Sequence, residues 1–301
     1  MPKDLILSYA TNADYDGLRR LIVSARRFCP ADEVDIVIII NPMGERYARL
    51  AEEYGVQLYP CNSIWKEIRP SKQMRIFYRL LLGLAEGFER YTALFGSKDI
   101  SSAVYRVLAY PWCHAQTQRY LAFEEFLKVR CTYRMVFLTD ARDVVFQGNP
   151  FHDLDPDKLH TFLQTKAETY GLENVDTQWF RAVFGQHALE HVKGKIATCC
   201  GTTTGGYAPM MEYLAQMSAC ILAHRLTPLD QAIHNKIVYS DYPQDLLAFH
   251  DNDAGVVLTL GGMSSNDFEL DENGLRIQGR LIPVIHMYDR IDVTKAYFAN
   301  V

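Results

Sequence analysis

Residues 34–40 read VDIVIII, and this stretch decides the fold class. Six of these seven residues are both apolar and β-branched. Such a run is typical of a strand that is covered on both faces, as in a parallel sheet. Asn41-Pro42 ends the strand, because this dipeptide favours a turn. The apolar run is far too short to span a membrane.

The segments on either side of this stretch alternate between strand and helix. Residues 5–9 predict a first strand, and residues 15–28 carry apolar side chains at helical spacing. Downstream, residues 45–54 predict a helix that Gly55 closes, and residues 56–59 predict a third strand. The first 60 residues therefore read β-α-β-α-β, which is typical of a layered α/β fold.

The rest of the chain continues this mixture of helices and strands. The predicted helices cover residues 71–91, most of 97–130, 210–224 and 229–237. The predicted strands cover residues 135–139, 256–260 and 281–285, with a hairpin over 267–278 that turns at Glu272-Asn-Gly274. We expect a single domain over residues 1–301, with a helical excursion near 61–130.

Composition excludes several classes of protein. The chain has 301 residues, with 31 basic against 36 acidic side chains, a balance that argues against a nucleic-acid binder but allows a local basic pocket. Seven cysteines form no even framework, so we expect reduced thiols in a cytoplasmic protein. A Lys and an Asp precede any apolar run at the N-terminus, so we expect neither a signal peptide nor a transmembrane segment.

The strongest chemical signal is the segment FLTDARDVVF, residues 137–146. It places Asp140 and Asp143 at the carboxyl end of a buried strand, where open α/β sheets bind ligands. Two neighbouring carboxylates repel each other unless a cation lies between them, and such oxygens suit Mg²⁺ or Mn²⁺ bound together with phosphates. The alternative is that Asp140 caps a turn while Asp143 pairs with Arg142 on the surface.

Two later segments carry weaker signals. His286 follows the predicted strand 281–285 and would complete a Mn²⁺ site, although a lone histidine at a strand end is more often only hydrogen-bonded. Asp230 and Gln231 open a predicted helix after Pro228. They would project polar groups into a cleft, or Asp230 would simply cap the helix.

Other motifs leave their alternatives open. Residues 201–206, GTTTGG, are not a P-loop because no Lys-Ser/Thr follows at the required spacing; they form either a close backbone approach to a ligand or a plain loop. Lys72, Arg75 and Arg119 lie on predicted helices and suit phosphate contacts, although most such residues are merely solvated. His187 and His191 do not form a zinc-hydrolase motif, because the residue after His187 is not Glu.

The order of these parts resembles the GT-A class of nucleotide-sugar glycosyltransferases. The segment FLTDARDVVFQGNPF, residues 137–151, is similar to a variant TDxRDVVFQ-x-x-PF motif that replaces a strict Asp-x-Asp in related transferases. The resemblance implies a Rossmann-like GT-A fold, with a mixed, mostly parallel sheet flanked by helices. It also implies transfer of a sugar from a nucleotide-diphosphate donor, a UDP-sugar being favoured, to a hydroxyl of a glycan or glycolipid. The implied cofactor is Mn²⁺ or Mg²⁺, and the implied setting is polysaccharide biosynthesis.

The resemblance assigns roles to individual residues. Asp140, Asp143 and His286 match the metal ligands. Two residues instead of one separate the aspartates, so Asp140 either binds the metal or contacts the ribose. Asp230 and Gln231 resemble an Asp-Gln pair near the anomeric carbon, which favours retention of configuration. With the basic residues, the predicted donor-binding set is Tyr9, Ala10, Thr11, Asn12, Lys72, Arg75, Arg119, Asp140, Arg142, Gly205 and Gly206.

Two other functions remain open at this point. One is a Mg²⁺-dependent aspartyl phosphohydrolase, which needs a second aspartate two positions after the first, where this chain has Arg142. The other is a non-catalytic nucleotide- or glycan-binding protein. We find no basic amphipathic anchor, so any membrane contact would be peripheral.

Overall fold

The computed structural model describes residues 2–11, 14–41, 44–61, 80, 83–84, 113–130, 132–224, 227–299 and 301. Asn12, Lys72 and Arg75 lie outside these residues, as does most of the predicted helix 71–91. The single domain and the helical excursion near 61–130 therefore stay predictions. In the described part, no helix is both long and apolar enough to cross a membrane.

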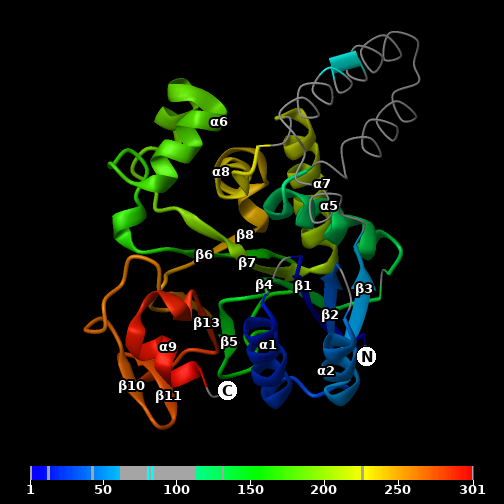
Figure 1. Ribbon diagram of the computed structural model, residues 1–301. Coiled ribbons are helices and arrows are strands. Elements are labelled where there is room, and N and C mark those ends of the chain that lie inside the picture. The colour runs from blue at the N-terminus through cyan, green and yellow to red at the C-terminus, as the bar shows by residue number, and fades with distance from the viewer. Residues whose placement is uncertain are drawn as a thin grey trace.

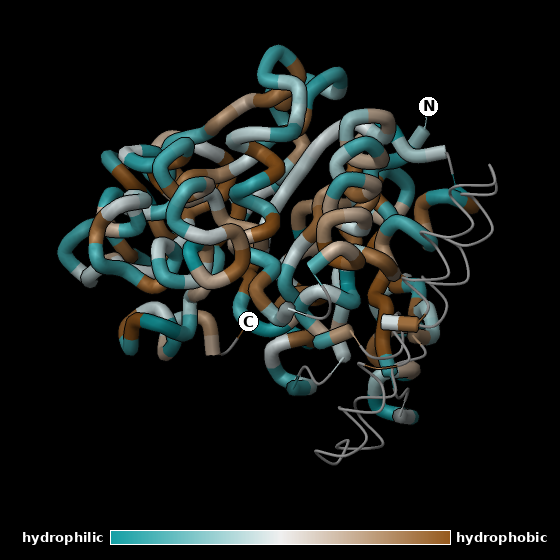
Figure 2. The backbone as a smooth tube through the Cα atoms, turned by 90° about the horizontal axis from the view of Figure 1, so that it is seen from above, coloured by the Kyte–Doolittle hydropathy of each residue, from teal (hydrophilic) through white to brown (hydrophobic). Residues whose placement is uncertain are grey.

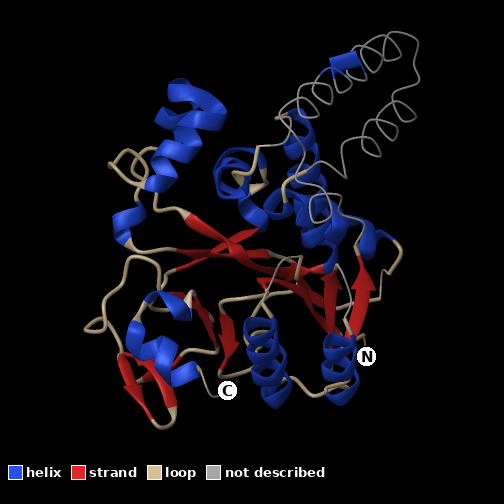
Figure 3. Ribbon diagram, in the orientation of Figure 1, coloured by secondary structure: helices blue, strands red, loops and turns tan. Residues whose placement is uncertain are grey.

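A seven-stranded mixed sheet forms the centre of the protein, in the order β3-β2-β1-β4-β7-β6-β8 (Figures 1 and 3). Its strands are β1 (Asp4–Tyr9), β2 (Val34–Ile40), β3 (Gln57–Pro60), β4 (Met135–Asp140), β6 (Leu159–Leu163), β7 (Thr198–Gly206) and β8 (Leu247–His250). Every neighbouring pair is parallel except the two that β7 makes with β4 and β6. The predicted α/β class with a mostly parallel, helix-flanked sheet is confirmed, and it is compatible with a Rossmann-like fold.

Helices cover both faces of this sheet (Figure 1). On one face lie α1 (Tyr15–Phe28) and α2 (Glu45–Glu53), and on the other lie α5 (Ala115–Lys128), α7 (Tyr207–Ala223) and α8 (Asp230–Lys236). The longer α6 (Val175–Val192) packs against α8.

The stretch VDIVIII shows why two covered faces suit this sequence. Ile36, Ile38 and Ile40 pack into the core between the sheet and helices α1 and α2. Val37 and Ile39 pack into the core on the other face, between the sheet and helices α5 and α7. All five are at most 3% exposed, because successive side chains of a strand point to opposite faces. Figure 2 shows hydrophobic stretches of the backbone mainly in the interior and hydrophilic stretches mainly at the periphery.

Two small sheets lie beside the central one. One has the order β5-β13-β9, from β5 (Val144–Phe146), β13 (Val284–His286) and β9 (Val257–Thr259). The other contains β10 (Glu269–Asp271), β11 (Gly274–Ile277) and β12 (Arg280–Leu281), next to α9 (Asp292–Phe298). The predicted hairpin is confirmed, since Asp271 pairs with Gly274 across a two-residue turn.

One predicted strand is wrong. Residues 281–285 do not form one strand, because Leu281 ends β12 and Val284 begins β13, in different sheets. Proline lacks the N–H that a central strand needs, and Pro283 lies at this break. As a result β13 pairs with β5, and His286 lies opposite Val144, one residue after Asp143.

Candidate active site

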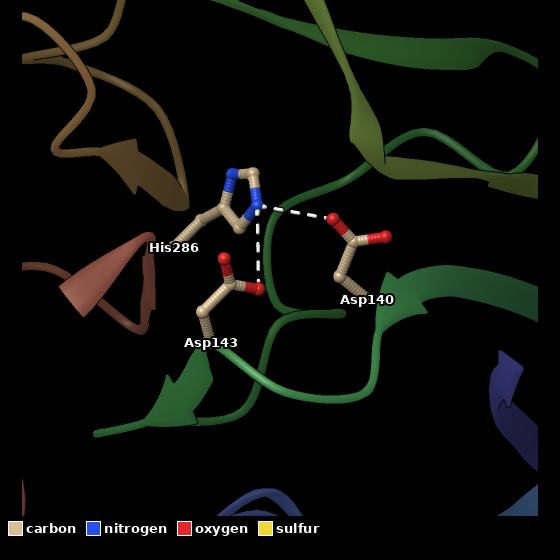
Figure 4. A group of neighbouring side chains, drawn as sticks. All are labelled: Asp140, Asp143 and His286. Carbon is tan, nitrogen blue, oxygen red and sulfur yellow. Dashed lines mark ion pairs between the residues drawn. The ribbon is translucent and has the colours of Figure 1, made fainter. Parts of the chain in front are cut away.

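Three side chains that could ligate a metal meet at the carboxyl end of β4. Asp140 is the last residue of β4, Asp143 lies just before β5, and His286 is the last residue of β13. Figure 4 shows both carboxylates turned towards the imidazole. Nε2 of His286 lies 3.3 Å from Oδ2 of Asp140 and 4.0 Å from Oδ1 of Asp143. One ligand atom from each residue falls within 4.8 Å of the others.

Backbone packing fixes this arrangement. The chain turns between β4 and β5 beneath α1, where a Cβ on Gly17 would lie only 2.5 Å from the carbonyl oxygen of Arg142. After β13, Met287 adopts a φ of 58° and donates its N–H to the carbonyl of Asp143 at 2.7 Å. Glycine at position 17 and this turn therefore hold Asp143 against His286.

Gly201, in β7, leaves open the space in front of the candidate metal ligands Asp140 and His286. A Cβ at this position would lie 2.5 Å from Oδ2 of Asp140 and 3.0 Å from Nε2 of His286. Real Cβ atoms do not approach oxygen so closely, so only glycine keeps these two ligand atoms accessible. The sequence-based prediction had singled out Gly205 and Gly206, at the other end of this segment.

Gly205 and Gly206 lie at the opposite end of β7 from the site. They pair with Val136 and Met135, at the start of β4, whereas the metal-binding groups lie at its end. The glycines serve packing, since a Cβ on Gly206 would overlap the carbonyl of Pro156. The predicted donor-binding role of Gly205 and Gly206 is thus corrected, and the segment is a strand, which its β-branched threonines favour.

Arg119 joins two carboxylates at the floor of the site. From α5 it forms an ion pair with Asp140, and its Nη2 donates to Oδ2 of Asp230 at 2.7 Å. Burial alone would raise the pKa of Asp140, but Arg119 and then His286 hold that pKa well below its usual range. Burial raises the pKa of Asp230 above its usual range despite Arg119.

His286 is fully buried and is polarised from both sides. Its Nδ1 lies 3.3 Å from Sγ of Cys199 and 3.4 Å from Oγ1 of Thr259. Burial opposes protonation, but Cys199 and Asp140 together raise the pKa of His286 well above its usual value. Burial also raises the pKa of Asp143.

The residues fit a divalent cation. Nε2 of His286 is buried and makes no hydrogen bond of acceptable geometry within the described part of the chain. The same atom faces two carboxylates, one of which is only 5% exposed. Carboxylate oxygens suit Mg²⁺ and Mn²⁺. The imidazole of His286 is a common additional ligand for a transition metal once the cation displaces its Nε2 proton.

These groups line a cavity of about 410 Å³. Of the predicted residues, the lining includes Tyr9, Thr11, Arg119, Arg142, Asp230 and Gln231. Ala10 is buried in the core against α1 instead. Arg142 keeps half of its side chain exposed, and its Nη2 lies 3.5 Å from Oδ2 of Asp143. Arg290, also half exposed, adds a third guanidinium to the lining, one that the sequence did not single out.

Two of the predicted residues also support the walls of the cavity. The hydroxyl of Tyr9 donates to Oε1 of Gln118 at 2.8 Å. The amide of Gln231 accepts from the N–H of Cys200 and donates to the carbonyl of Thr198, both at 2.9 Å. Gln231 therefore ties α8 to the strand that carries Gly201.

The cavity also contains polar groups that the sequence did not reveal. Asp176, in the first turn of α6, is 6% exposed and accepts a hydrogen bond from Nε2 of Gln164 at 2.9 Å. Burial, and then the charge of Glu168, raise the pKa of Asp176 to about 6. In sequence, Asp176 after Asn174 looks like ordinary helix capping. Trp179, one turn further along α6, reaches the same cavity.

No protein-family profile matches the sequence, and no curated protein matches it significantly.

Proposed function

We propose that this protein is a metal-dependent glycosyltransferase of the GT-A type, which transfers a sugar from a nucleotide-diphosphate donor to a glycan hydroxyl. One observation carries the proposal: Asp140, Asp143 and His286 converge in a cavity that also exposes two arginines. A cation and guanidinium groups together suit a diphosphate. A UDP-sugar is the favoured donor, as the resemblance implies.

The reaction exchanges one C–O bond for another. The bond between the anomeric carbon and the diphosphate oxygen breaks, and its electron pair stays on the diphosphate. A new bond forms between the anomeric carbon and the acceptor oxygen, whose proton leaves to a phosphate oxygen or a carboxylate. When bound, Mn²⁺ supplies Lewis-acid stabilisation of the charge on the departing diphosphate.

The chain's own residues orient the reactants. Asp140, Asp143 and His286 would hold the cation, and Arg142 offers a planar fork for phosphate oxygens. Arg119 keeps the Asp230 carboxylate fixed in the cavity, where it can face the developing positive charge of the sugar. The ion pair with Arg119 engages one oxygen of Asp230. Retention, with the acceptor's proton leaving to the phosphate, is the outcome that the Asp-Gln resemblance favours.

The aspartyl phosphohydrolase is less well supported. Its nucleophile must present a free carboxylate, whereas Arg119 and His286 contact both oxygens of Asp140. The position of its acid/base carries Arg142, which cannot lose a proton at neutral pH. A non-catalytic nucleotide- or glycan-binding protein would share the same binding site, so only a measurement of sugar transfer distinguishes it from a transferase.

A thermal-shift screen tests the donor site. The protein is melted with UDP, GDP, ADP or CMP, each with Mn²⁺, Mg²⁺ or EDTA. A ligand at a hundredfold excess over its dissociation constant stabilises the native state by about 2.7 kcal/mol. We expect one nucleoside diphosphate to raise Tm only with the metal, and Asp143→Asn to lose this effect. No shift with any nucleotide in a folded protein would refute the donor site.

A further inference from the structure

A second, larger cavity adjoins the candidate active site. Its volume is about 850 Å³, compared with about 410 Å³ for the first. Its walls come mainly from the end of β6 and the segment after it (163–167), the loop after β8 (251–253), and residues 262–269 leading into β10. Ile196, Ile277 and Gln278 complete the lining. The cavity has room for a ligand of several sugar rings, because drug-sized ligands occupy pockets of about 300–1,000 Å³.

Gln164 connects the two cavities, because its side chain lines both. Its Nε2 donates to Oδ2 of Asp176, which faces the first cavity. A molecule that fills the second cavity and extends past Gln164 therefore arrives beside Asp176. An ionised carboxylate accepts hydrogen bonds from hydroxyl groups, so this junction suits an incoming alcohol.

The lining of the second cavity suits sugar hydroxyls. Asn266 and Gln278 offer amides that both donate and accept hydrogen bonds. Phe268 adds an aromatic ring that is only partly buried. A few polar groups beside an aromatic surface are the usual composition of a small-molecule site.

Charge narrows the class of ligand. The lining carries the carboxylates Asp251, Asp253, Asp267 and Glu269, against the single ammonium of Lys166. Like charges repel and opposite charges attract over several ångströms, most strongly at low salt. The cavity thus disfavours phosphorylated or carboxylated sugars and favours neutral or amino sugars.

We propose that this second cavity binds the acceptor, and that the acceptor is an oligosaccharide of neutral or amino sugars that presents its hydroxyl beside Asp176. This inference rests on the proposed transferase function and names its acceptor class. The donor then occupies the first cavity, and the sugar is transferred at the junction near Gln164.

The test measures oligosaccharide binding without any donor. Three β-1,4-linked tetrasaccharides of equal length serve as probes in saturation-transfer NMR and titration calorimetry: cellotetraose, its glucosamine analogue and its glucuronate analogue. We expect the glucosamine tetramer to bind most tightly, cellotetraose less tightly, and the glucuronate tetramer not at all at low salt.

A double variant locates the binding. Asp253→Asn with Glu269→Gln removes two exposed carboxylates of the cavity, and Asp32→Asn with Glu52→Gln is the control with two exposed carboxylates elsewhere. Two charges at about 7 Å in water change affinity roughly fivefold after screening. We expect the preference for glucosamine over glucose units to fall about fivefold in the first variant and to stay unchanged in the control.

The outcomes separate this inference from the proposed function. Equal or stronger binding of the glucuronate tetramer, binding of none of the three, or an equal effect of the control variant overturns the acceptor site. A protein that fails here but still binds a nucleoside diphosphate with Mn²⁺ keeps its donor site. A protein that binds the tetramers but no nucleotide is a glycan-binding protein, and the transferase function fails.

Discussion

Replacing Gly201 by alanine tests the proposed metal centre without removing any of its proposed ligands. The new methyl carbon would lie 2.5 Å from Oδ2 of Asp140 and 3.0 Å from Nε2 of His286. Metal–ligand bonds are about 2.0–2.2 Å long, so the methyl group takes the volume where an ion would bind. The φ of Gly201 is not in the left-handed region, so alanine fits the strand backbone.

The expected effects on folding and on binding differ clearly. Overpacking costs about 1–3 kcal/mol of folding stability, which leaves a folded protein. With nucleotide at 100 times the wild-type dissociation constant, the wild type gains about 2.7 kcal/mol, or roughly 5 °C in Tm. A hundredfold loss of affinity reduces this gain to about 0.4 kcal/mol, under roughly 1 °C.

The assay is a thermal melt with UDP and Mn²⁺, with circular dichroism to confirm the fold. Gly44→Ala is the matched control, because its Cβ would lie 3.6 Å from the ring of Tyr47, an ordinary contact, and neither residue lines the cavity. We expect Gly44→Ala to keep the full shift and Gly201→Ala to lose it. A folded Gly201→Ala protein with the full metal-dependent shift would refute our account of the cation site.

Three further predictions concern buried charge. Asp176→Asn should stabilise the protein by about 3 kcal/mol at pH 8 in urea unfolding, because burial raises the folded pKa of Asp176 to about 6 from 3.8 in the unfolded chain and so penalises the ionised form. The gain should vanish below pH 4, and an equal gain at all pH values would contradict this prediction. His234 lies between Thr198 and Tyr213, and burial, followed by the charge of Arg119, lowers its pKa to about 3, so it should cost stability as pH falls from 6.5 towards 3, by about 1.4 kcal/mol per pH unit. His234→Gln should flatten that pH dependence, and an unchanged slope would count against the assignment. Arg119→Met should cost roughly 3–5 kcal/mol in urea unfolding, since it leaves the buried Asp230 and the partly buried Asp140 without their shared guanidinium. A loss below about 1 kcal/mol would show that these carboxylates do not depend on Arg119.

Local patterns in the sequence predicted the first half of the sheet well. The predicted helix over 15–28 and the strand over 34–40 have the same bounds in the structure. Both carry a strong periodicity or a continuous β-branched run, which depends only on neighbouring residues. The sequence also predicted correctly that Asp140 and His286 lie at the ends of strands, which are β4 and β13 in the structure.

Features that depend on tertiary pairing were missed. Strands β5, β6 and β8 are only three to five residues long, and β7 combines glycine with threonine, which reads equally as a loop. The cavity is lined by Gly201 of β7 and by Asp176 and Trp179 of α6, because tertiary packing brings these two elements to it. No local pattern distinguishes Gly201 from Gly205, since their difference lies in which side chains stand opposite each.

The most direct measurement of the central claim is the nucleotide product formed from a UDP-sugar. The purified protein is incubated with UDP-glucose or UDP-galactose, Mn²⁺ and the tetrasaccharide probes, then quenched with EDTA and analysed by liquid chromatography and mass spectrometry. The account predicts UDP and an oligosaccharide one hexose heavier, both lost without Mn²⁺ and in Asp143→Asn. Release of UMP or inorganic phosphate, or equal UDP formation by Asp143→Asn, would contradict it.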